Sequence, residues 1–152
     1  MNSNLKISTF RELWQQSEEQ HWLPVHGTSM LPLLHEGDDI LVSHDLTNIR
    51  RGDILVFQKA EGLIAHRVIR IIHQPGKSNL FLTKGDNCTY FDAPLSEVEI
   101  LGKVNSVHKN SSIYNFTSTG WQFGNNVLAG CHLLVGTLFQ TARQIKHTLY
   151  KK

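Results

Sequence analysis

The strongest sequence evidence for the fold is the stretch DILVFQKAEGLIAHRVIRII, residues 53–72. It contains two runs rich in β-branched and large apolar residues, 53–57 and 63–72, and Glu61 and Gly62 lie between them. Such runs are typical of strands, and a glycine between two strands favours a hairpin turn. We therefore expect this stretch to form a hairpin at the centre of a β-sheet.

Further short β-rich runs lie on either side of this hairpin, at residues 40–43, 80–84 and 100–107. Turn-forming residues separate the runs, and no helical pattern of about 10 to 15 residues alternates with them, which argues against a parallel β-α-β sheet. We predict a mainly β fold with flanking helices, in which the strands form a mixed or antiparallel, barrel-like sheet.

The pattern changes at both ends of the chain. Before residue 22, apolar residues at helical spacing predict a short amphipathic helical segment over 1–21. Residues 22–122 form the predicted β domain, and residues 123–152 form an apolar and basic helical tail. Within that tail, the apolar run 127–139 allows two interpretations: a buried helix packed on the sheet, or an interfacial helix that makes peripheral membrane contact through residues 127–152.

Composition narrows the class of protein. A chain of 152 residues with 40% hydrophobic and 18% charged residues and a formal net charge of +2 is typical of one globular domain and requires no nucleic-acid partner. Cys88 and Cys131 fit no metal-ligand spacing, so we expect free thiols, no metal and no cofactor. The N-terminus lacks the apolar run of a secretory signal peptide and no segment is long enough to span a membrane, which predicts a cytoplasmic protein.

The residues that carry chemistry lie in three separate segments. Ser29 follows Gly27 in a turn, His66 lies within the second strand of the hairpin, and Asp86 ends the run 80–84 in a tight turn. A serine hydroxyl needs a neighbouring base to become a nucleophile, and a carboxylate on the other imidazole nitrogen fixes the tautomer of that base. Each residue alone is also explained by turn or core structure, but together they fit a Ser-His-Asp arrangement.

The order of the motifs resembles that of the signal peptidase I and LexA-like serine peptidases, the S24/S26 type. The motifs are GTSMLPLL around Ser29, EGDDILV and RRGDILVF on the following strands, AHRVIRI around His66, and TKGDN around Asp86. A histidine at the base position is similar to the endoplasmic-reticulum and archaeal members, in which it replaces the lysine of the bacterial ones. The resemblance implies Ser29 as nucleophile, His66 as base and Asp86 as the residue that orients it.

The same resemblance implies a polypeptide substrate that runs extended beside the nucleophile. Oxyanion and substrate-binding contacts are expected from Thr28, Met30, Leu31, Ile64 and Ala65. Typical signal peptidases have a serine two positions before the nucleophile, whereas this chain has glycine there.

The sequence thus predicts a serine endopeptidase that hydrolyses a peptide bond in a leader- or signal-like segment of another polypeptide. Two alternatives remain open at this point: a non-catalytic peptide-binding module on the same fold, and a self-cleaving regulator of the LexA kind. Only 28 residues precede Ser29, which leaves little room for the DNA-binding domain of such a regulator.

Overall fold

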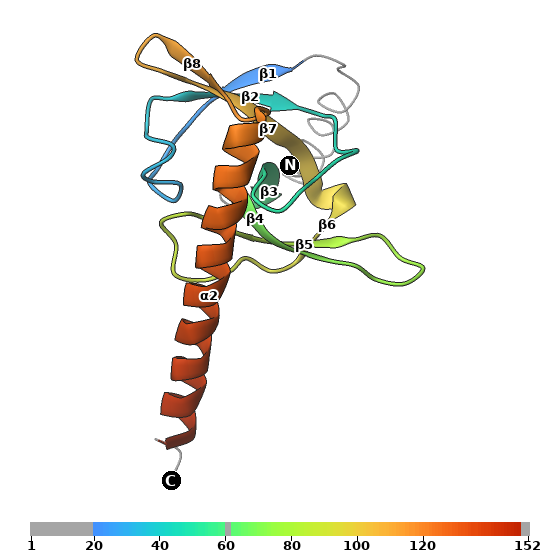
Figure 1. The fold of residues 1–152 in the computed structure, drawn as a ribbon, viewed down its shortest axis with the longest axis vertical. Helices are drawn as coiled ribbons and strands as arrows, with labels where there is room; N and C mark the ends of the chain where they lie inside the picture. The colour runs from blue at the N-terminus through green and yellow to red at the C-terminus, as the bar shows by residue number, and fades with distance from the viewer. Residues whose placement is uncertain (1–19, 60–61, 150–152) are drawn as a thin grey trace, which may run out of the picture.

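A computed structural model describes residues 20–59 and 62–149 of the chain. One open antiparallel sheet makes up most of it, with the strand order β1-β2-β7-β3-β4-β5-β6 and with β8 paired to β7 (Figure 1). The strands are β1 (His21–Pro24), β2 (Asp39–Ser43), β3 (Ile54–Lys59), β4 (Gly62–Ile72), β5 (Leu80–Lys84), β6 (Leu95–Ser96), β7 (Ile100–Lys109) and β8 (Ser112–Asn115). The predicted β-rich runs are confirmed, and the sheet is not closed. Of the helical segment expected over 1–21, residues 1–19 lie outside the described residues; Gln20 is in no element and His21 begins β1.

The predicted hairpin is the pair β3–β4. Its register runs from Ile54 opposite Arg67 to Lys59 opposite Gly62. Gly62 has φ 129°, a conformation that residues with a Cβ rarely adopt, so a glycine suits this end of the turn. Beyond the hairpin, β4 pairs with β5 only from Arg67 onward, through Arg67–Ile72. In the described part of the chain no strand pairs with the outer edge of the first half of β4, from Gly62 to His66.

Both faces of β3 are buried, which explains its continuous apolar sequence. Ile54 and Val56 belong to the larger core cluster, and Leu55 belongs to a smaller cluster on the opposite face. The larger cluster contains Met30, Leu34, Ile40, Val42, Ile54, Val56, Leu101, Val104, Val107 and Phe116. The loop around Ser29 is therefore anchored in the main core through Met30 and Leu34.

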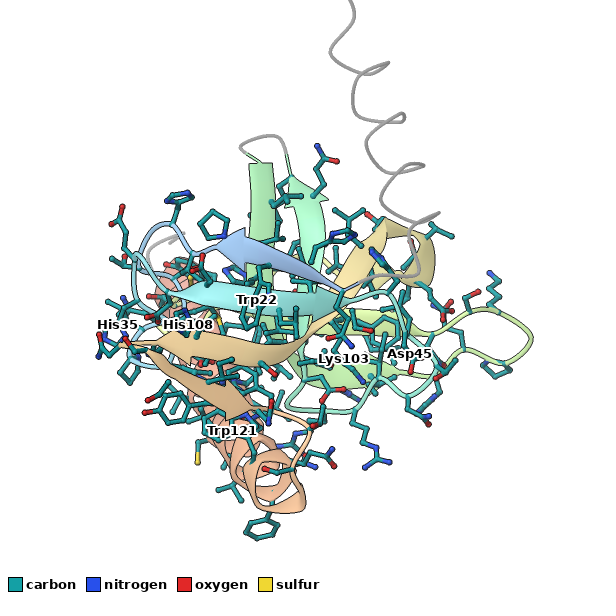
Figure 2. All side chains as sticks on the ribbon, turned by 90° about the horizontal axis from the view of Figure 1, so that it is seen from above. Trp22, His35, Asp45, Lys103, His108 and Trp121 are labelled. Atoms are coloured by element: carbon teal, nitrogen blue, oxygen red, sulfur yellow. The ribbon has the colours of Figure 1, made fainter. Side chains whose placement is uncertain are left out.

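The C-terminal helix α2 (Thr119–Leu149) packs against the sheet with its first turns, whereas its C-terminal half extends past the strands (Figure 1). Trp121 lies at the start of α2, close beneath the sheet (Figure 2), and stacks on Phe116 with ring centroids 4.7 Å apart. Asn125 and Ala129 on the same side are buried. Phe123, Val127 and Leu134, on the opposite side of the described part of the helix, are apolar and exposed.

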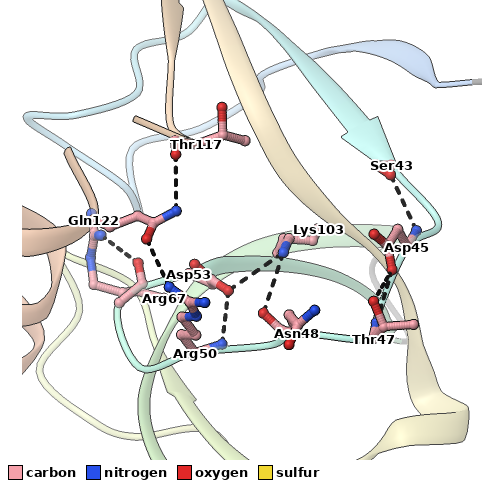
Figure 3. Close-up of polar contacts among 11 residues, drawn as sticks. Ser43, Asp45, Thr47, Asn48, Arg50, Asp53, Arg67, Lys103, Thr117 and Gln122 are labelled. Atoms are coloured by element: carbon pink, nitrogen blue, oxygen red, sulfur yellow. Dashed lines mark hydrogen bonds and ion pairs between the residues drawn. The ribbon is translucent and has the colours of Figure 1, made fainter. Parts of the chain in front are cut away.

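Polar contacts fasten the segment before β3 to the rest of the fold (Figure 3). The Asp53 carboxylate accepts a hydrogen bond from the backbone N–H of Arg50 (2.8 Å) and lies 3.8 Å from Lys103 Nζ. Burial raises the pKa of Asp53, although these contacts oppose the shift. The Arg50 side chain donates to Gln122 Oε1 (3.0 Å), which joins this segment to α2.

A substitution at Gly102, in β7, tests how tightly the sheet packs. A Cβ at Gly102 would lie 2.5 Å from Val42 Cγ1 and 2.8 Å from the backbone oxygen of Ser43. We expect Gly102→Ala to lower the free energy of unfolding by about 2 kcal/mol in urea titration, because backbone must shift to make room. Gly120→Ala is the matched control, since nothing lies within 4 Å of a Cβ there. Equal stabilities of the two variants would contradict this packing.

Candidate active site

Ser29 is presented by a short turn between β1 and β2. Gly27 has φ 81°, and hydrogen bonds from Leu31 N to Thr28 O (3.2 Å) and from Leu34 N to Met30 O (2.9 Å) close the turn that follows. Met30, the next residue, is buried, whereas Ser29 remains partly exposed. The turn therefore holds the Ser29 hydroxyl at the surface of the core.

A second loop, directly after β5, holds this turn in place. The backbone N–H of Asn87 donates to the backbone oxygen of Ser29 (2.8 Å), and Asn87 Nδ2 donates to the backbone oxygen of Thr28 (3.2 Å). A Cβ at Gly85 would lie 2.7 Å from Ser29 O and 2.9 Å from His66 Nε2. Only glycine leaves room for the serine turn and the histidine ring to meet at this point.

His66 lies on β4 and is almost fully buried. Its Nδ1 is 2.7 Å from Oδ2 of Asp92, and its ring packs edge-on against Phe57 with centroids 6.0 Å apart. An ionised carboxylate can only accept hydrogen bonds, so Nδ1 is the donor and, in the neutral tautomer, Nε2 is the nitrogen with a free lone pair. This is the tautomer that can take a proton from a serine hydroxyl.

Asp92 is itself held by several donors. Its Oδ2 also accepts from Thr83 Oγ1 (2.8 Å), and its Oδ1 accepts from Lys59 Nζ (2.6 Å). Burial alone would raise the pKa of Asp92, but the hydrogen bonds from His66, Lys59 and Thr83 outweigh it and lower the pKa from 3.8 to about 2. Asp92 is therefore ionised at neutral pH.

Asp86, the carboxylate that the sequence predicted beside His66, lies elsewhere. Its two oxygens accept from Nε (2.8 Å) and Nη2 (2.6 Å) of Arg67, whose side chain is completely buried. Arg67 Nη1 also donates to Gly52 O (2.9 Å) and to Asn125 Oδ1 (2.7 Å) on α2. The structure thus places Asp92, and not Asp86, against His66. The structure also pairs Arg67 with Asp86. A fully buried guanidinium requires a carboxylate that is close enough for a bidentate ion pair.

A further buried contact lies beneath the loop after β5. Lys84 Nζ donates to Nδ1 of His132 on α2 (3.1 Å), and His132 Nε2 faces Asp86 Oδ1 at 3.5 Å. Burial lowers the pKa of Lys84, while Cys88 and Asp86 oppose the shift. Burial and the neighbouring Lys84 lower the pKa of His132, which favours the neutral ring, and its Nδ1 can then accept a hydrogen bond from Lys84 Nζ. These contacts attach α2 to the loop that supports Ser29.

A cavity of about 580 Å³ opens beside Ser29 and His66. Of the predicted substrate contacts, Met30, Ile64 and Ala65 line it, whereas Thr28 and Leu31 do not. Its lining residues are Leu23, Pro24, Val25, His26, Gly27, Ser29, Met30, Leu34, Ile40, Val56, Leu63, Ile64, Ala65, His66 and Cys88. The cavity is mainly apolar, and it lies between the end of β1 and the unpaired edge of β4.

Sequence reasoning did not single out Asp92, Lys59 or Thr83. Asp92 lies in an irregular loop after β5, and a backbone hydrogen bond from Asp92 N to Thr83 O (2.9 Å) returns that loop to the sheet. No periodicity or motif in the sequence marks this contact, because it depends on how the loop folds back. Within residues 20–59 and 62–149, no group of three or more His, Cys, Asp or Glu side chains is arranged to hold a metal ion.

Comparison with known proteins agrees with this fold. A family model described as Peptidase S24-like matches residues 3–105, and the chain belongs to that family. It is also similar to the signal peptidase complex catalytic subunit SEC11C of Homo sapiens, Canis lupus familiaris and Mus musculus, with 33% identity over 96 residues in each case. The match covers 57% of this chain and 50% of each relative, so the chain spans about half the length of the curated relatives it matches.

The environment of Asp92 predicts how acid affects stability. Its pKa of about 2 in the folded protein lies below 3.8, so it stabilises the fold above pH 4 and this contribution is lost as the pH falls toward 2. We expect Asp92→Asn to lower the unfolding free energy by roughly 2 kcal/mol at neutral pH, and by less as the pH approaches 2. Denaturant titration at several pH values measures this difference. The exposed-site variant Asp39→Asn serves as the control, and a constant difference between Asp92→Asn and the unsubstituted protein would contradict the prediction.

Proposed function

We propose that this protein is a serine peptidase that cleaves a peptide bond in an extended segment of another polypeptide. The observation that carries the proposal is the 2.7 Å contact between His66 Nδ1 and Asp92 Oδ2, in a site where His66 and Ser29 line the same cavity. Membership of a peptidase family and similarity to signal peptidase catalytic subunits support this activity.

In the proposed mechanism, Ser29 Oγ attacks the carbonyl carbon of the substrate while His66 Nε2 takes its proton. Asp92 stabilises the resulting imidazolium through Nδ1. The imidazolium then gives the proton to the leaving amine, which breaks the peptide bond and leaves an ester on Ser29. Water, deprotonated by the same imidazole, hydrolyses this ester and regenerates the enzyme. The backbone N–H of Ser29 is the proposed oxyanion donor, with Thr28 beside it as a second candidate.

The substrate proposed for this site is a leader- or signal-like segment with apolar side chains. The outer edge of β4 from Leu63 to His66, which pairs with no strand in the described part of the chain, borders the cavity on one side, and residues 23–27 at the end of β1 border it on the other. An extended peptide can add to such an edge as a further strand, with alternate side chains entering the cavity. The apolar lining, which includes Met30, Ile64 and Ala65, favours apolar side chains there.

Serine-directed labelling tests this mechanism. A fluorophosphonate probe should label the protein, and Ser29→Ala and His66→Ala should each abolish labelling. Asp92→Asn should slow it at least about 100-fold, because the imidazole loses the tautomer that leaves Nε2 free. Asp86→Asn is the matched comparison: it removes the negative charge that pairs with Arg67 but leaves the contact between Asp92 and His66 intact.

The outcomes separate the alternatives. We expect folded Asp86→Asn protein to label within a few-fold of the unsubstituted rate, although its stability falls. Labelling unaffected by Ser29→Ala would refute the proposed nucleophile. A protein that binds an apolar peptide but never reacts with the probe would be the non-catalytic peptide-binding module.

We also propose that the exposed side of α2 binds the surface of an anionic membrane. Its described side chains include a continuous exposed apolar surface, formed by Phe123, Val127, Leu128, Cys131, Leu134 and Val135. We call this the outer face of α2. It lies on the side opposite Asn125 and Ala129, which are buried against the sheet. Among the described helices none is long and apolar enough to cross a membrane.

The charge of the C-terminal segment supports an anionic membrane as the partner of this surface. Residues 119–152 contain no Asp or Glu, but they contain Arg143, Lys146, Lys151 and Lys152. A second copy of this segment would supply no acidic residue to pair with these basic residues. Anionic lipid headgroups supply the opposite charge, and basic residues that accompany an apolar helix face are typical of interfacial helices.

Vesicle flotation tests this contact. The full-length protein should float with vesicles of phosphatidylglycerol and phosphatidylcholine, and less with phosphatidylcholine alone. Leu134→Glu should reduce the bound fraction at least about tenfold, because it removes apolar burial and adds a charge that the lipids repel. Val98→Glu, at a side chain that is 72% exposed on the sheet domain, is the matched control and should still float. Failure to float, or lipid-free self-association that Leu134→Glu abolishes, would overturn the proposal.

A further inference from the structure

Asp92 binds a lysine through the carboxylate oxygen that does not contact the histidine. Asp92 Oδ2 is shared by His66 Nδ1 (2.7 Å) and Thr83 Oγ1 (2.8 Å), whereas Oδ1 accepts from Lys59 Nζ at 2.6 Å. The Asp92 side chain is only 8% exposed. Lys59 is therefore the charged partner of the oxygen that His66 does not use.

The position of Lys59 is fixed by the hairpin and not by a flexible loop. It is the last residue of β3, opposite Gly62 in the register of the pair β3–β4, so it lies near one end of the strand that carries His66. Its Nζ lies 5.5 Å from the centroid of the Phe57 ring, and the same ring packs against His66. The lysine, the phenylalanine and the histidine thus form one packed group around the carboxylate.

We propose that Lys59 is a positioning residue that acts through Asp92, and that its charge sets the pH range in which His66 acts as a base. This inference rests on the proposed peptidase function. An unopposed carboxylate beside an imidazole favours its protonated form, and a protonated imidazole cannot accept the serine proton. The ammonium group of Lys59 offsets part of the carboxylate charge, so that His66 remains neutral to lower pH.

The other groups near this pair do not replace Lys59. Thr83 holds Asp92 Oδ2 but carries no charge. Cys88 faces the Nε2 side of His66, since its Sγ would lie 2.7 Å from a Cβ at Gly85, where Nε2 would lie 2.9 Å away. Removal of the lysine charge should therefore leave Asp92 in place, held by Thr83 and by its backbone contact with Thr83 O.

The pH dependence of probe labelling tests the inference. In Lys59→Met and in Lys59→Gln, the acidic limb of the profile should move to higher pH by about 0.5 to 1 pH unit, a shift kept modest because the lysine is partly exposed. In Lys59→Arg, the acidic limb should lie at the same pH as in the unsubstituted protein. Lys103→Met, which removes a lysine paired with Asp53 away from His66, should leave the limb unchanged.

A second readout separates this inference from the peptidase proposal. In the Ser29→Ala background, NMR titration of the His66 ring should show a higher midpoint in Lys59→Met than with lysine present, whether or not the protein labels. An unreactive protein with a shifted midpoint would refute the peptidase function but retain the electrostatic role of Lys59. Unchanged limbs and midpoints in both neutral variants, even with reduced stability, would show that Lys59 is only a structural ion-pair partner and would overturn the inference.

Discussion

The buried guanidinium of Arg67 is the constraint on which the rest of the site depends. A charge with no access to water must be paired and fully hydrogen-bonded, or it destabilises the fold strongly. Arg67 meets this requirement through Asp86 after β5, Gly52 before β3 and Asn125 on α2. One side chain on β4 thus fixes the relative positions of three segments that are distant in the sequence.

The position of Ser29 follows from this constraint. Because Asp86 is held by Arg67, its neighbours Gly85 and Asn87 are held as well, and Asn87 binds the backbone of the turn that carries Ser29. His66 is the residue before Arg67 on the same strand. The ion pair of Arg67 and Asp86 therefore connects the segments that carry the nucleophile and the base, although it takes no part in the proposed chemistry.

The loop between β5 and β6 contributes two aspartates with different roles. Asp86 lies at its start, pairs with a permanent cation and supports the structure. Asp92 lies further along and returns to β5 through Thr83, where it contacts His66. Both carboxylates are nearly buried, so each requires its own cation: Arg67 for Asp86, and Lys59 for Asp92. This division explains why one loop can both support the serine turn and orient the histidine.

The sequence by itself determined the local structure and the identity of two proposed site residues. Alternating and continuous apolar runs specify strands because they bury one or both faces, and Gly62 specifies a hairpin because of its backbone freedom; the structure contains these elements. Ser29 and His66 could be proposed because serine chemistry needs a base and each residue lies within a recognisable motif. For α2, the sequence predicted an apolar helix but not its outer face, because an apolar run does not reveal which side of the helix will pack against the sheet.

Only the tertiary structure decided which carboxylate meets His66. Asp86 and Asp92 both lie in the loop between β5 and β6, and sequence spacing cannot tell which of them reaches the imidazole. The choice follows from the alternation of β4: His66 and Arg67 point to opposite faces, so a carboxylate bound to Arg67 lies on the wrong face for His66. Asp92 reaches the other face because the loop folds back along β5. Contacts between side chains of different strands, and the face on which they occur, depend on the complete fold. Local sequence patterns therefore do not reveal them.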